Sequence, residues 1–402
     1  MNCFLGMYCR SYQAALKSAS YFVEWRKPEL LEGEGSLSLL PKKMKENGHK
    51  RVLIVSDSFI SSLDMMEDLR EKLESCGIRS ILYNRTMPNP TVGVVEEALR
   101  WYQNCFCDCL IAFGGGSVMD TAKAVAARVV NPSKSLGQMK GVQKVGCGIP
   151  PLYVIPTTAG TGSEATIAAV ITDPDKQTKY QIDDTRLVPR VAVLDPLVTL
   201  GLPPHLTATT GMDALTHAIE SYINRFRSSE TLDMSRKAVN LIFENLHRAY
   251  EDGSDVTARD NMLKASHYAG IAFTRGYVGY VHALAHALGG KYNIAHGLAN
   301  AVILPYVLEY YGDCIDRRLA ELCRLTDCCF PELGDHQNAV LFIEAIKELN
   351  RSMGIPEKLE GIRDEDIDDL VDHAYNEANP FYPVPRILGK KDLRILFNQI
   401  RK

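Results

Sequence analysis

Short apolar runs alternate with helix-length amphipathic segments over the first half of the chain. The runs are apolar almost throughout rather than strictly alternating, which is typical of strands covered on both faces. Five strands are predicted, RVLIVSD at 51–57, SILYN at 80–84, DCLIAF at 108–113, LYVIPTT at 152–158 and VAVLDP at 191–196. Helices are predicted between them, for example over residues 62–76 and 91–104. Strand followed by helix, repeated, predicts a parallel α/β sheet.

The pattern changes after about Pro203, where apolar residues recur at a spacing near 3.6. In SRKAVNLIFENLHRAY, for example, Val239, Ile242 and Leu246 fall on one face of a helix. The helices predicted in this half cover residues 205–225, 232–250, 258–274, 280–290, 297–311 and 315–325. No strand is predicted after residue 200. We therefore expect an α/β domain over residues 1–200 and an all-helical domain over residues 201–402.

The first twenty residues, MNCFLGMYCRSYQAALKSAS, precede the repeating pattern. They are predicted to form a frayed tail, with a short amphipathic helix as the alternative. They lack a basic stretch followed by a clean apolar stretch, so they do not look like a secretory signal. No apolar run in the chain approaches the roughly 20 residues that span a bilayer, and we expect no membrane association.

Charge and cysteine content narrow the choice of partner and compartment. The formal net charge of −4 and the absence of a Lys/Arg block argue against a nucleic-acid partner. Eleven cysteines in 402 residues do not make a disulfide scaffold. In CFCDC, at 105–109, the period of two indicates one face of a strand, which favours buried free thiols over a metal or cluster site. Reduced thiols predict a cytoplasmic protein.

A glycine-rich loop stands in CLIAFGGGSVMDTAKAVA, between a predicted strand and a predicted helix. Glycines let backbone amides approach a ligand closely, and a helix N-terminus attracts an anion. Three successive glycines exceed what a tight turn requires, so the loop predicts phosphate binding. Ser117 and Asp120 have the spacing of a capping box. The GxGxxG of the ordinary dinucleotide fingerprint is absent.

Two further features of this half fit a dinucleotide. The loop PTTAGTGSEAT, at 156–166, offers hydroxyls and glycines that could close around a pyrophosphate. Asp57 ends a predicted strand, where an acid typically hydrogen-bonds the adenosine ribose. A carboxylate there would repel a 2′-phosphate, which favours NAD over NADP, although an aspartate at a strand end is also a common turn former.

Metal-ligand residue types are concentrated in the helical half. Asp213 and His217 lie four residues apart, His282 and His286 repeat that spacing, and His296 follows ten residues later. One such histidine is more typical of a satisfied polar residue on a helix face. Two pairs and a further histidine favour a divalent first-row metal, Fe(II) or Zn(II). The spacing does not show which of the five residues stays off the metal.

The motifs GGGSVMDTAKAVA, PTTAGTGSEAT, GMDALTHAIESY and VHALAHALGGKYNIAHGLANAVILP together resemble the iron-containing (group III) alcohol dehydrogenase family. The resemblance extends over about residues 25–400. It implies an N-terminal dinucleotide-binding α/β domain with a parallel sheet, an all-α C-terminal metal-binding domain and a homodimer. It also implies NAD(H) and one divalent metal as cofactors, with Fe(II) ahead of Zn(II) and Mn(II), and an alcohol or aldehyde as substrate.

The same resemblance assigns roles to individual residues. It implies four metal ligands, Asp213, His217, His282 and His296. It leaves His286 near the nicotinamide as a candidate for proton transfer. The cofactor contacts that it implies are Asp57, Asn89 in the MPNP loop, Gly114, Gly115, Gly116, Ser117, Thr157, Thr158 and Lys179.

One departure from the family bears on the substrate. The family often has Phe-Ser/Thr-Asn where this chain has Phe-Thr-Arg, so that Phe273 could line the substrate site and Arg275 replaces asparagine. An arginine there could pair with an anionic tail, as in sulfoacetaldehyde, or could be a surface residue or a cofactor-phosphate contact. The hypothesis is that the substrate is a short aldehyde or primary alcohol, with an anionic tail as a refinement. Alternatives are polyol oxidation as in glycerol dehydrogenase, a dehydroquinate synthase-like lyase, and a non-catalytic metal or nucleotide sensor.

Overall fold

The structure is a computed structural model, and it describes residues 3–174 and 178–402. Two compact units are distinguished by their internal contacts. The helical unit contains residues 3–23, 203–253 and 268–402, and the α/β unit contains residues 24–202 and 254–267. Within the described ranges, no helix combines the length and the apolar character needed to cross a bilayer.

A six-stranded sheet, parallel throughout, forms the centre of the α/β unit, in the order β1-β9-β6-β4-β2-β3. Its strands are β1 (Glu29–Glu32), β2 (Arg51–Val55), β3 (Arg79–Tyr83), β4 (Cys109–Gly114), β6 (Leu152–Pro156) and β9 (Val191–Leu194). All five predicted strands are confirmed, and the predicted parallel α/β class with them. The edge strand β1, which pairs with β9, was not predicted.

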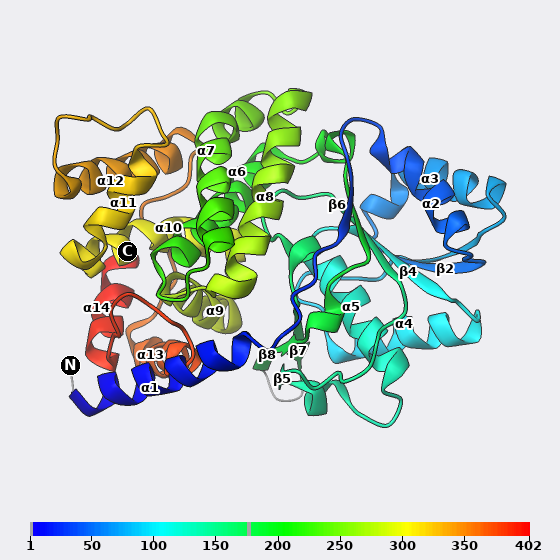
Figure 1. Cartoon of the computed structure of the whole chain (residues 1–402), viewed down its shortest axis with the longest axis horizontal. Helices are drawn as coiled ribbons and strands as arrows, with labels where there is room; N and C mark the ends of the chain where they lie inside the picture. Colours follow the sequence, from blue (N-terminus) through cyan, green and yellow to red (C-terminus); the bar gives the residue numbers. More distant parts are fainter. Residues whose placement is uncertain (1–2, 175–177) are drawn as a thin grey trace. The chain divides into compact units, whose positions relative to one another are not determined.

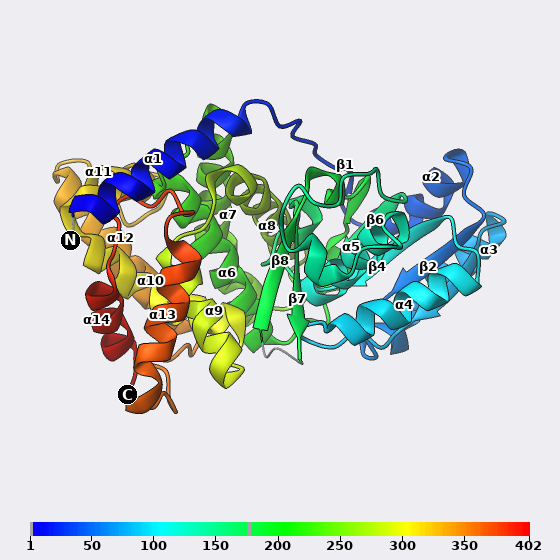
Figure 2. The ribbon, with the colours of Figure 1, turned by 90° about the horizontal axis from the view of Figure 1, so that it is seen from below.

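Helices cover the sheet on both faces, with α4 (Val92–Asn104) and α5 (Gly116–Val130) on one and α2 (Leu40–Glu46) and α3 (Asp64–Ser75) on the other (Figures 1 and 2). Successive residues of β2 point to opposite faces. Leu53 and Val55 are buried with α4 and α5, whereas Val52 and Ile54 are buried with α2 and α3. Burial on both faces explains why residues 52–55 of β2 are apolar without interruption and not only at alternate positions.

A second, three-stranded sheet belongs to the same unit and was not predicted. In it β7 (Ala168–Asp173) pairs antiparallel with β8 (Thr178–Asp183), and the short β5 (Gly141–Val142) pairs parallel with β8. The loop that carries Asn89 reaches this sheet, because the amide of Thr172 donates to Pro90 O at 2.8 Å.

The helical unit contains the predicted C-terminal helices. These are α6 (Pro204–Ile223), α7 (Ser229–Glu251), α8 (Val256–Gly276), α9 (Tyr280–Tyr292), α10 (His296–Tyr311) and α11 (Asp316–Cys323). Only residues 268–276 of α8 belong to the helical unit, and residues 256–267 belong to the α/β unit. Three more helices follow, α12 (Asp335–Ser352), α13 (Ile367–Ala378) and α14 (Lys390–Ile400). Among the described residues after position 200 there is no strand, only an isolated bridge between Leu359 and Arg401.

The prediction of a frayed N-terminal tail was wrong for the described part of that segment. Residues Cys3–Ser20 form helix α1 of the helical unit (Figure 1), while residues 1–2 lie outside the described residues. Arg10 donates to Val384 O at 2.9 Å, and Gln13 donates to Tyr382 O at 2.7 Å. These long-range hydrogen bonds hold α1 against the segment between α13 and α14, which local sequence could not reveal.

Candidate metal centre and cofactor site

Three helices of the helical unit bring the four predicted metal ligands together. Helix α6 carries Asp213 and His217, α9 carries His282, and α10 begins at His296. One ligand atom of each of these residues lies within 4.8 Å of all the others. Bonds of about 2 Å to a common cation require such convergence, and one carboxylate with three imidazoles suits a divalent first-row metal. The donor set therefore fits the predicted metal.

Aromatic rings line the cluster. The Phe273 ring stacks on His217, with 4.1 Å between centroids, and His217 in turn stacks on His282 at 4.5 Å. His286 stacks on His296 at 5.1 Å. The predicted pocket residue Phe273 thus contacts a ligand side chain directly, and the stacking restricts the ring orientation of His217.

Asn300 lies in the middle of the ligand cluster and was missed in the sequence. Its Nδ2 lies 2.6 Å from Asp213 Oδ1, 3.2 Å from His282 Nε2 and 3.1 Å from His296 Nε2. An amide group has two protons and cannot serve three acceptors at once. Its own Oδ1 is buried without a hydrogen-bond partner among the described residues. The cluster is thus under-satisfied without a cation. The spacing of four from His296 was the available signal.

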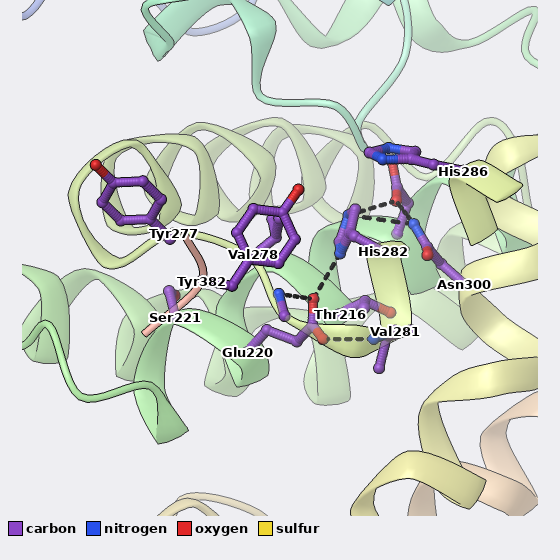
Figure 3. Close-up of polar contacts among 12 residues, drawn as sticks. Thr216, Glu220, Ser221, Tyr277, Val278, Val281, His282, His286, Asn300 and Tyr382 are labelled. Atoms are coloured by element: carbon purple, nitrogen blue, oxygen red, sulfur yellow. Dashed lines mark hydrogen bonds and ion pairs between the residues drawn. The ribbon is translucent and has the colours of Figure 1, made fainter. Parts of the chain in front are cut away.

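Glu220, which was also not identified from the sequence, holds the metal-ligand candidate His282 through the ring nitrogen Nδ1 (Figure 3). Its Oε2 is 2.6 Å from His282 Nδ1 and accepts from the amide of Gly279 at 2.8 Å, while Oε1 accepts from the amide of Val281 at 2.8 Å. A carboxylate on Nδ1 sets the ring tautomer and leaves Nε2 to face the metal. Glu220 follows His217 by three residues on α6, so helical spacing could have identified it.

Burial of the cluster favours the neutral form of the His282 imidazole, which is the form that binds a metal. Burial, with the nearby imidazoles of His217 and His296, lowers the pKa of His282 well below its usual range. His282 is therefore neutral at physiological pH and keeps a lone pair for a metal. Burial raises the pKa of Asp213, which is opposed by His217 and by the amide of Asn300. A bound cation would favour the ionised carboxylate.

His286, the fifth residue of the sequence pattern, has a carboxylate partner of its own. Its Nδ1 lies 2.7 Å from Glu377 Oε1, which also accepts from the Tyr382 hydroxyl at 2.7 Å. The His286 side chain is 33% exposed, whereas that of His282 is 2% exposed. His286 thus lies beside the cluster and is the more accessible of the two. Glu377 lies 91 residues away in the sequence, and no motif pointed to it.

In the α/β unit, the predicted cofactor residues gather at one edge of the parallel sheet. Asp57 follows β2, Gly114 ends β4, and Thr157 follows β6. The amide of Thr157 donates to Gly114 O at 3.2 Å. The chain leaves β2 for β3 on one side and returns to β4 on the other. Ligands of open α/β sheets bind at the carboxyl edge where the strand order reverses in this way.

The two small-residue loops form a cradle that fits a phosphate group. A Cβ at Gly116 would lie 2.8 Å from Thr161 Cγ2, and one at Gly115 would lie 3.4 Å from the Thr158 side chain. The Thr158 hydroxyl is buried without a hydrogen-bond partner among the described residues. Since Gly116 is the first residue of α5, the helix N-terminus faces this polar, glycine-lined space.

The capping-box prediction at the start of α5 was wrong. The N-cap is Gly115, and Asp120 instead accepts from Ser163 Oγ and from the amide of Val170, each at 3.1 Å. Asp120 therefore joins α5 to the second loop and to β7. Lys123, one turn further on, is fully buried, and its ammonium group lies 2.6–3.1 Å from five oxygens of residues 163–168 that share its three protons. The two side chains hold the loop that carries Thr157 and Thr158.

The remaining predicted site residues have these positions. Lys179 donates to Asn89 Oδ1 at 2.8 Å, so these two cofactor candidates are adjacent, and burial lowers the pKa of Lys179. Asp57 Oδ1 accepts from the amide of Ile60 at 2.8 Å, which is also the turn-forming role of such a residue. In the helical unit, Arg275 forms an ion pair with Glu230 at 2.6 Å. Glu230 thus already balances the charge of Arg275.

The cysteines of CFCDC lie at the α4–β4 junction rather than along one strand. Cys107 and Cys109 are buried, Cys105 is half-buried, and all three are free, but only Cys109 belongs to β4. Cys109 lies within 4.8 Å of donor atoms of His49 and Asp108. His49 Nε2 is 2.8 Å from the Tyr153 hydroxyl and Nδ1 is 3.2 Å from Asp108. Because both ring nitrogens are engaged, we assign no metal there.

Comparison with known proteins identifies the family of the chain. Residues 28–196 match the family described as iron-containing alcohol dehydrogenase, and residues 207–400 match the C-terminal part of the Fe-containing alcohol dehydrogenase family. Alcohol dehydrogenase 4 of Saccharomyces cerevisiae is 38% identical over 348 residues, which cover 86% of this chain and 90% of that protein.

Two solved structures resemble the chain over nearly its whole length. A 1,3-propanediol oxidoreductase has a TM-score of 0.90 and 32% identity, covering 94% of this chain and 99% of that chain. Sulfoacetaldehyde reductase from Bifidobacterium kashiwanohense, solved with NAD+, has a TM-score of 0.84 and 26% identity, covering 94% of this chain and 98% of that chain. The resemblance of the motifs is confirmed, and the chain belongs to the iron-containing alcohol dehydrogenase family of oxidoreductases.

Proposed function

We propose that this protein is an NAD(H)- and metal-dependent alcohol dehydrogenase that interconverts a short aldehyde and its primary alcohol. The observation that carries the proposal is the convergence of four ligand atoms, from Asp213, His217, His282 and His296, within 4.8 Å. A divalent metal held by these residues, Fe(II) ahead of Zn(II) and Mn(II), would supply Lewis acidity toward the substrate oxygen. The residues around it orient the reactants and exchange a proton.

The test is NADH oxidation with butanal by purified protein that has been reconstituted with each metal in turn. Turnover that disappears on chelation and returns with Fe(II) supports the proposal. Tight binding of metal and nucleotide without turnover on any aldehyde would instead indicate the non-catalytic sensor. Faster oxidation of glycerol than of primary alcohols would favour the glycerol dehydrogenase-like alternative.

The proposal assigns the dinucleotide to residues 1–200 and the metal to residues 201–402. The cofactor contacts are Asp57, Asn89, Gly114, Gly115, Gly116, Ser117, Thr157, Thr158 and Lys179. The cradle at Gly116 and the buried Thr158 hydroxyl support a phosphate site. The carboxylate of Asp57 at the end of β2 supports NAD rather than NADP, since it would repel a 2′-phosphate.

A Gly116→Ala substitution is expected to raise the Kd for NADH by about tenfold, because the new methyl group would overlap Thr161 and narrow the cradle. NADH fluorescence titration measures this change. Metal content should stay at the wild-type value, since the metal ligands lie in the other unit. Gly148→Ala is the matched control, because a Cβ at Gly148 would meet no atom within 4 Å. An unchanged Kd for Gly116→Ala would contradict the assignment of this loop.

His286 is proposed to exchange the proton of the reaction. Because Nδ1 faces Glu377, we assign proton exchange to Nε2. The hydrogen bond from Tyr382 to the same Glu377 oxygen supports a fixed ring orientation. His286 stands outside the four-residue ligand set but stacks on one of its members, His296.

A His286→Asn substitution is expected to lower kcat by about a hundredfold, because a positioned acid or base is worth at least that factor. Metal content and the Kd for NADH should not change. Partial rescue of kcat by added imidazole would identify proton transfer as the lost step. The control is His336→Asn, since His336 is 72% exposed on α12 and pairs with Asp316. Loss of metal from His286→Asn would show instead that His286 is a ligand.

An anionic tail on the substrate is proposed as a refinement, with Arg275 as its contact. The ion pair between Arg275 and Glu230 makes the guanidinium less available, because a substrate anion would compete with a carboxylate at 2.6 Å. If Arg275 binds the anionic tail, removal of the Glu230 charge should increase the preference for an anionic aldehyde over a neutral one. Phe273, stacked on His217, is the proposed apolar wall beside the metal.

The Arg275→Ala substitution is expected to lower the preference for sulfoacetaldehyde over acetaldehyde by about tenfold in kcat/KM, since hydrogen bonds to charged groups contribute about 1.5–3 kcal/mol. Glu230→Gln should raise the same preference by releasing the guanidinium. Steady-state kinetics with both aldehydes measures the ratio. Equal ratios in the wild type and in Arg275→Ala would eliminate the anionic substrate and leave a neutral aldehyde.

The proposal also includes the oligomeric state and the cellular location of the protein. A homodimer is expected from the family, and sedimentation equilibrium of the purified protein tests it. A cytoplasmic location is supported by ten cysteines of the described chain being free. A non-reducing mass measurement of protein from its native source would reveal any disulfide that contradicts this location.

A further inference from the structure

Two cysteines of the helical unit lie in contact at the end of α11. Cys323 is the last residue of the helix, and Cys328 follows in the turn LTDCC. Their sulfur atoms are 3.4 Å apart, and the hydroxyl oxygen of Thr326 lies 2.9 Å from Cys328 Sγ. Cys323 is fully buried, whereas Cys328 is half-buried. Neither residue belongs to the metal centre or to the cofactor loops.

Cys328 also forms part of the wall of a cavity of about 520 Å³. The cavity is lined by residues of α7, of the turn 325–328 and of α12, among them Phe243, His247, Leu325, Thr326, Leu349 and Ser352. Cys323 is not part of its lining. A small molecule that enters this space therefore meets one sulfur of the pair, with the other directly behind it.

The contacts shift the pKa values of the two thiols in opposite directions. The contact with the Cys323 thiol lowers the pKa of Cys328, although burial opposes this change. The same contact and burial raise the pKa of Cys323. The thiolate is the nucleophilic form of cysteine, so nucleophilic character is concentrated on the sulfur that lines the cavity.

We propose that Cys328 is a modification site for a small hydroperoxide and that Cys323 is its resolving thiol. The Cys328 thiolate attacks the peroxide, so that an S–O bond forms, the O–O bond breaks and the alkoxide or hydroxide leaves with a proton from solvent. Cys323 then attacks Cys328 Sγ, an S–S bond forms, and the sulfenic oxygen leaves as water. The two sulfurs are oxidised by two electrons in total, and the hydroperoxide is reduced.

The geometry allows the second step with a small movement. A disulfide needs the sulfurs at about 2.05 Å, so they must approach each other by little more than 1 Å. Residues 324–329 lie in turns between α11 and α12 and not in a helix or strand, so this adjustment breaks no regular hydrogen-bond ladder.

Peptide mapping of the full-length protein provides the test. Fully reduced protein is treated with one equivalent of hydrogen peroxide, alkylated and digested with trypsin. Arg324 lies between the two cysteines, so the proposed disulfide joins peptide 319–324 to peptide 325–347. A disulfide between the adjacent Cys328 and Cys329 would remain within peptide 325–347. The linked pair is the expected main product, whereas the internal product or oxidation elsewhere first would overturn the proposal.

Variants assign the two roles. Cys323→Ser should leave a sulfenic acid on Cys328 that dimedone traps, and Cys328→Ser should leave Cys323 unmodified. Before oxidation, wild-type Cys328 should react with iodoacetamide at pH 7 at least about threefold faster than the exposed Cys147, since thiolate fraction rises more than nucleophilicity falls. Cys329→Ser should leave that advantage unchanged. Slower alkylation of Cys328 than of Cys147 in the wild type would contradict the assignment without any variant.

Discussion

Replacing Asp213 with asparagine is expected to abolish metal binding and to lower kcat/KM by about a thousandfold. Asp213 is the only carboxylate among four ligands whose donor atoms lie within 4.8 Å. The amide of the variant keeps the shape and an oxygen for Asn300 but brings no negative charge to a divalent cation. Lewis-acid stabilisation of the transition state contributes several kcal/mol, and about 4 kcal/mol corresponds to a factor of a thousand. Metal analysis and steady-state kinetics measure the two effects.

Thermal unfolding distinguishes the loss of Asp213 as a metal ligand from damage to the fold. Metal at a hundred times its Kd should stabilise the wild type by about 2.7 kcal/mol, and the variant by nothing. Without metal, the variant should be as stable as the wild type, because a buried carboxylate becomes a neutral amide of the same shape. The control is Asp195→Asn, since buried Asp195 accepts from three backbone amides in the other unit. It should lose stability and keep its metal. A metal-replete Asp213→Asn protein would refute the proposed centre.

The parallel sheet could be predicted because its strands carry the information locally. β2 and β4 are buried on both faces, so residues 52–55 and 109–113 form unbroken apolar runs that stand out against the amphipathic helices. The edge strand β1 has only two apolar residues in ELLE and is half-exposed, so its pairing with β9 left no comparable pattern. β8 was missed for a similar reason, since polar and apolar residues mix in TKYQID, and β7, AAVITD, has a run of only four apolar residues.

The N-terminal helix and the start of α5 were mispredicted because tertiary contacts decide them. Arg10 and Gln13 look like ordinary solvent-facing residues, yet they bind carbonyl groups more than 360 residues away. Asp120 has the spacing of a cap, but the amide of Val170 and the Ser163 hydroxyl compete for its carboxylate. A prediction from local spacing cannot include a partner that only the fold supplies.

The metal centre was predictable to the extent that its residues repeat at helical spacing. Asp213 and His217 share one face of α6. Glu220 and Asn300 continue those faces at spacings of three and four from a predicted ligand, and could have been included. Glu377 could not, because it reaches His286 from a helix that carries no related motif.

Replacing Glu220 with glutamine is expected to weaken metal binding by about 10–100-fold, the usual cost of losing a residue that orients a histidine ligand. The carboxylate accepts from two backbone amides and faces His282 Nδ1, all within 2.8 Å. Burial raises its pKa to about 8, which hydrogen bonds from the backbone amides of Gly279, Val281 and His282 oppose. Glutamine has one acceptor oxygen, so its NH2 group must face a donor and one hydrogen bond at least is lost. Competition with a chelator of known affinity measures the metal Kd.

A control on α11, whose carboxylate contacts the same helix α6 through Tyr222, distinguishes positioning of the His282 ring from general stability. Tyr222 of α6 donates to Glu321 at 2.7 Å, and Glu321 contacts no metal ligand, so Glu321→Gln should lower stability without changing the metal Kd. Gly279→Ala should act in the direction of Glu220→Gln, because its methyl group would lie 2.7 Å from Glu220 Oε1 and displace the carboxylate from His282. If Glu220→Gln lowered only the unfolding temperature and bound metal as tightly as the wild type, Glu220 would be a packing residue. The orientation of His282 would then depend on the rings around it, among them the stacked ring of His217.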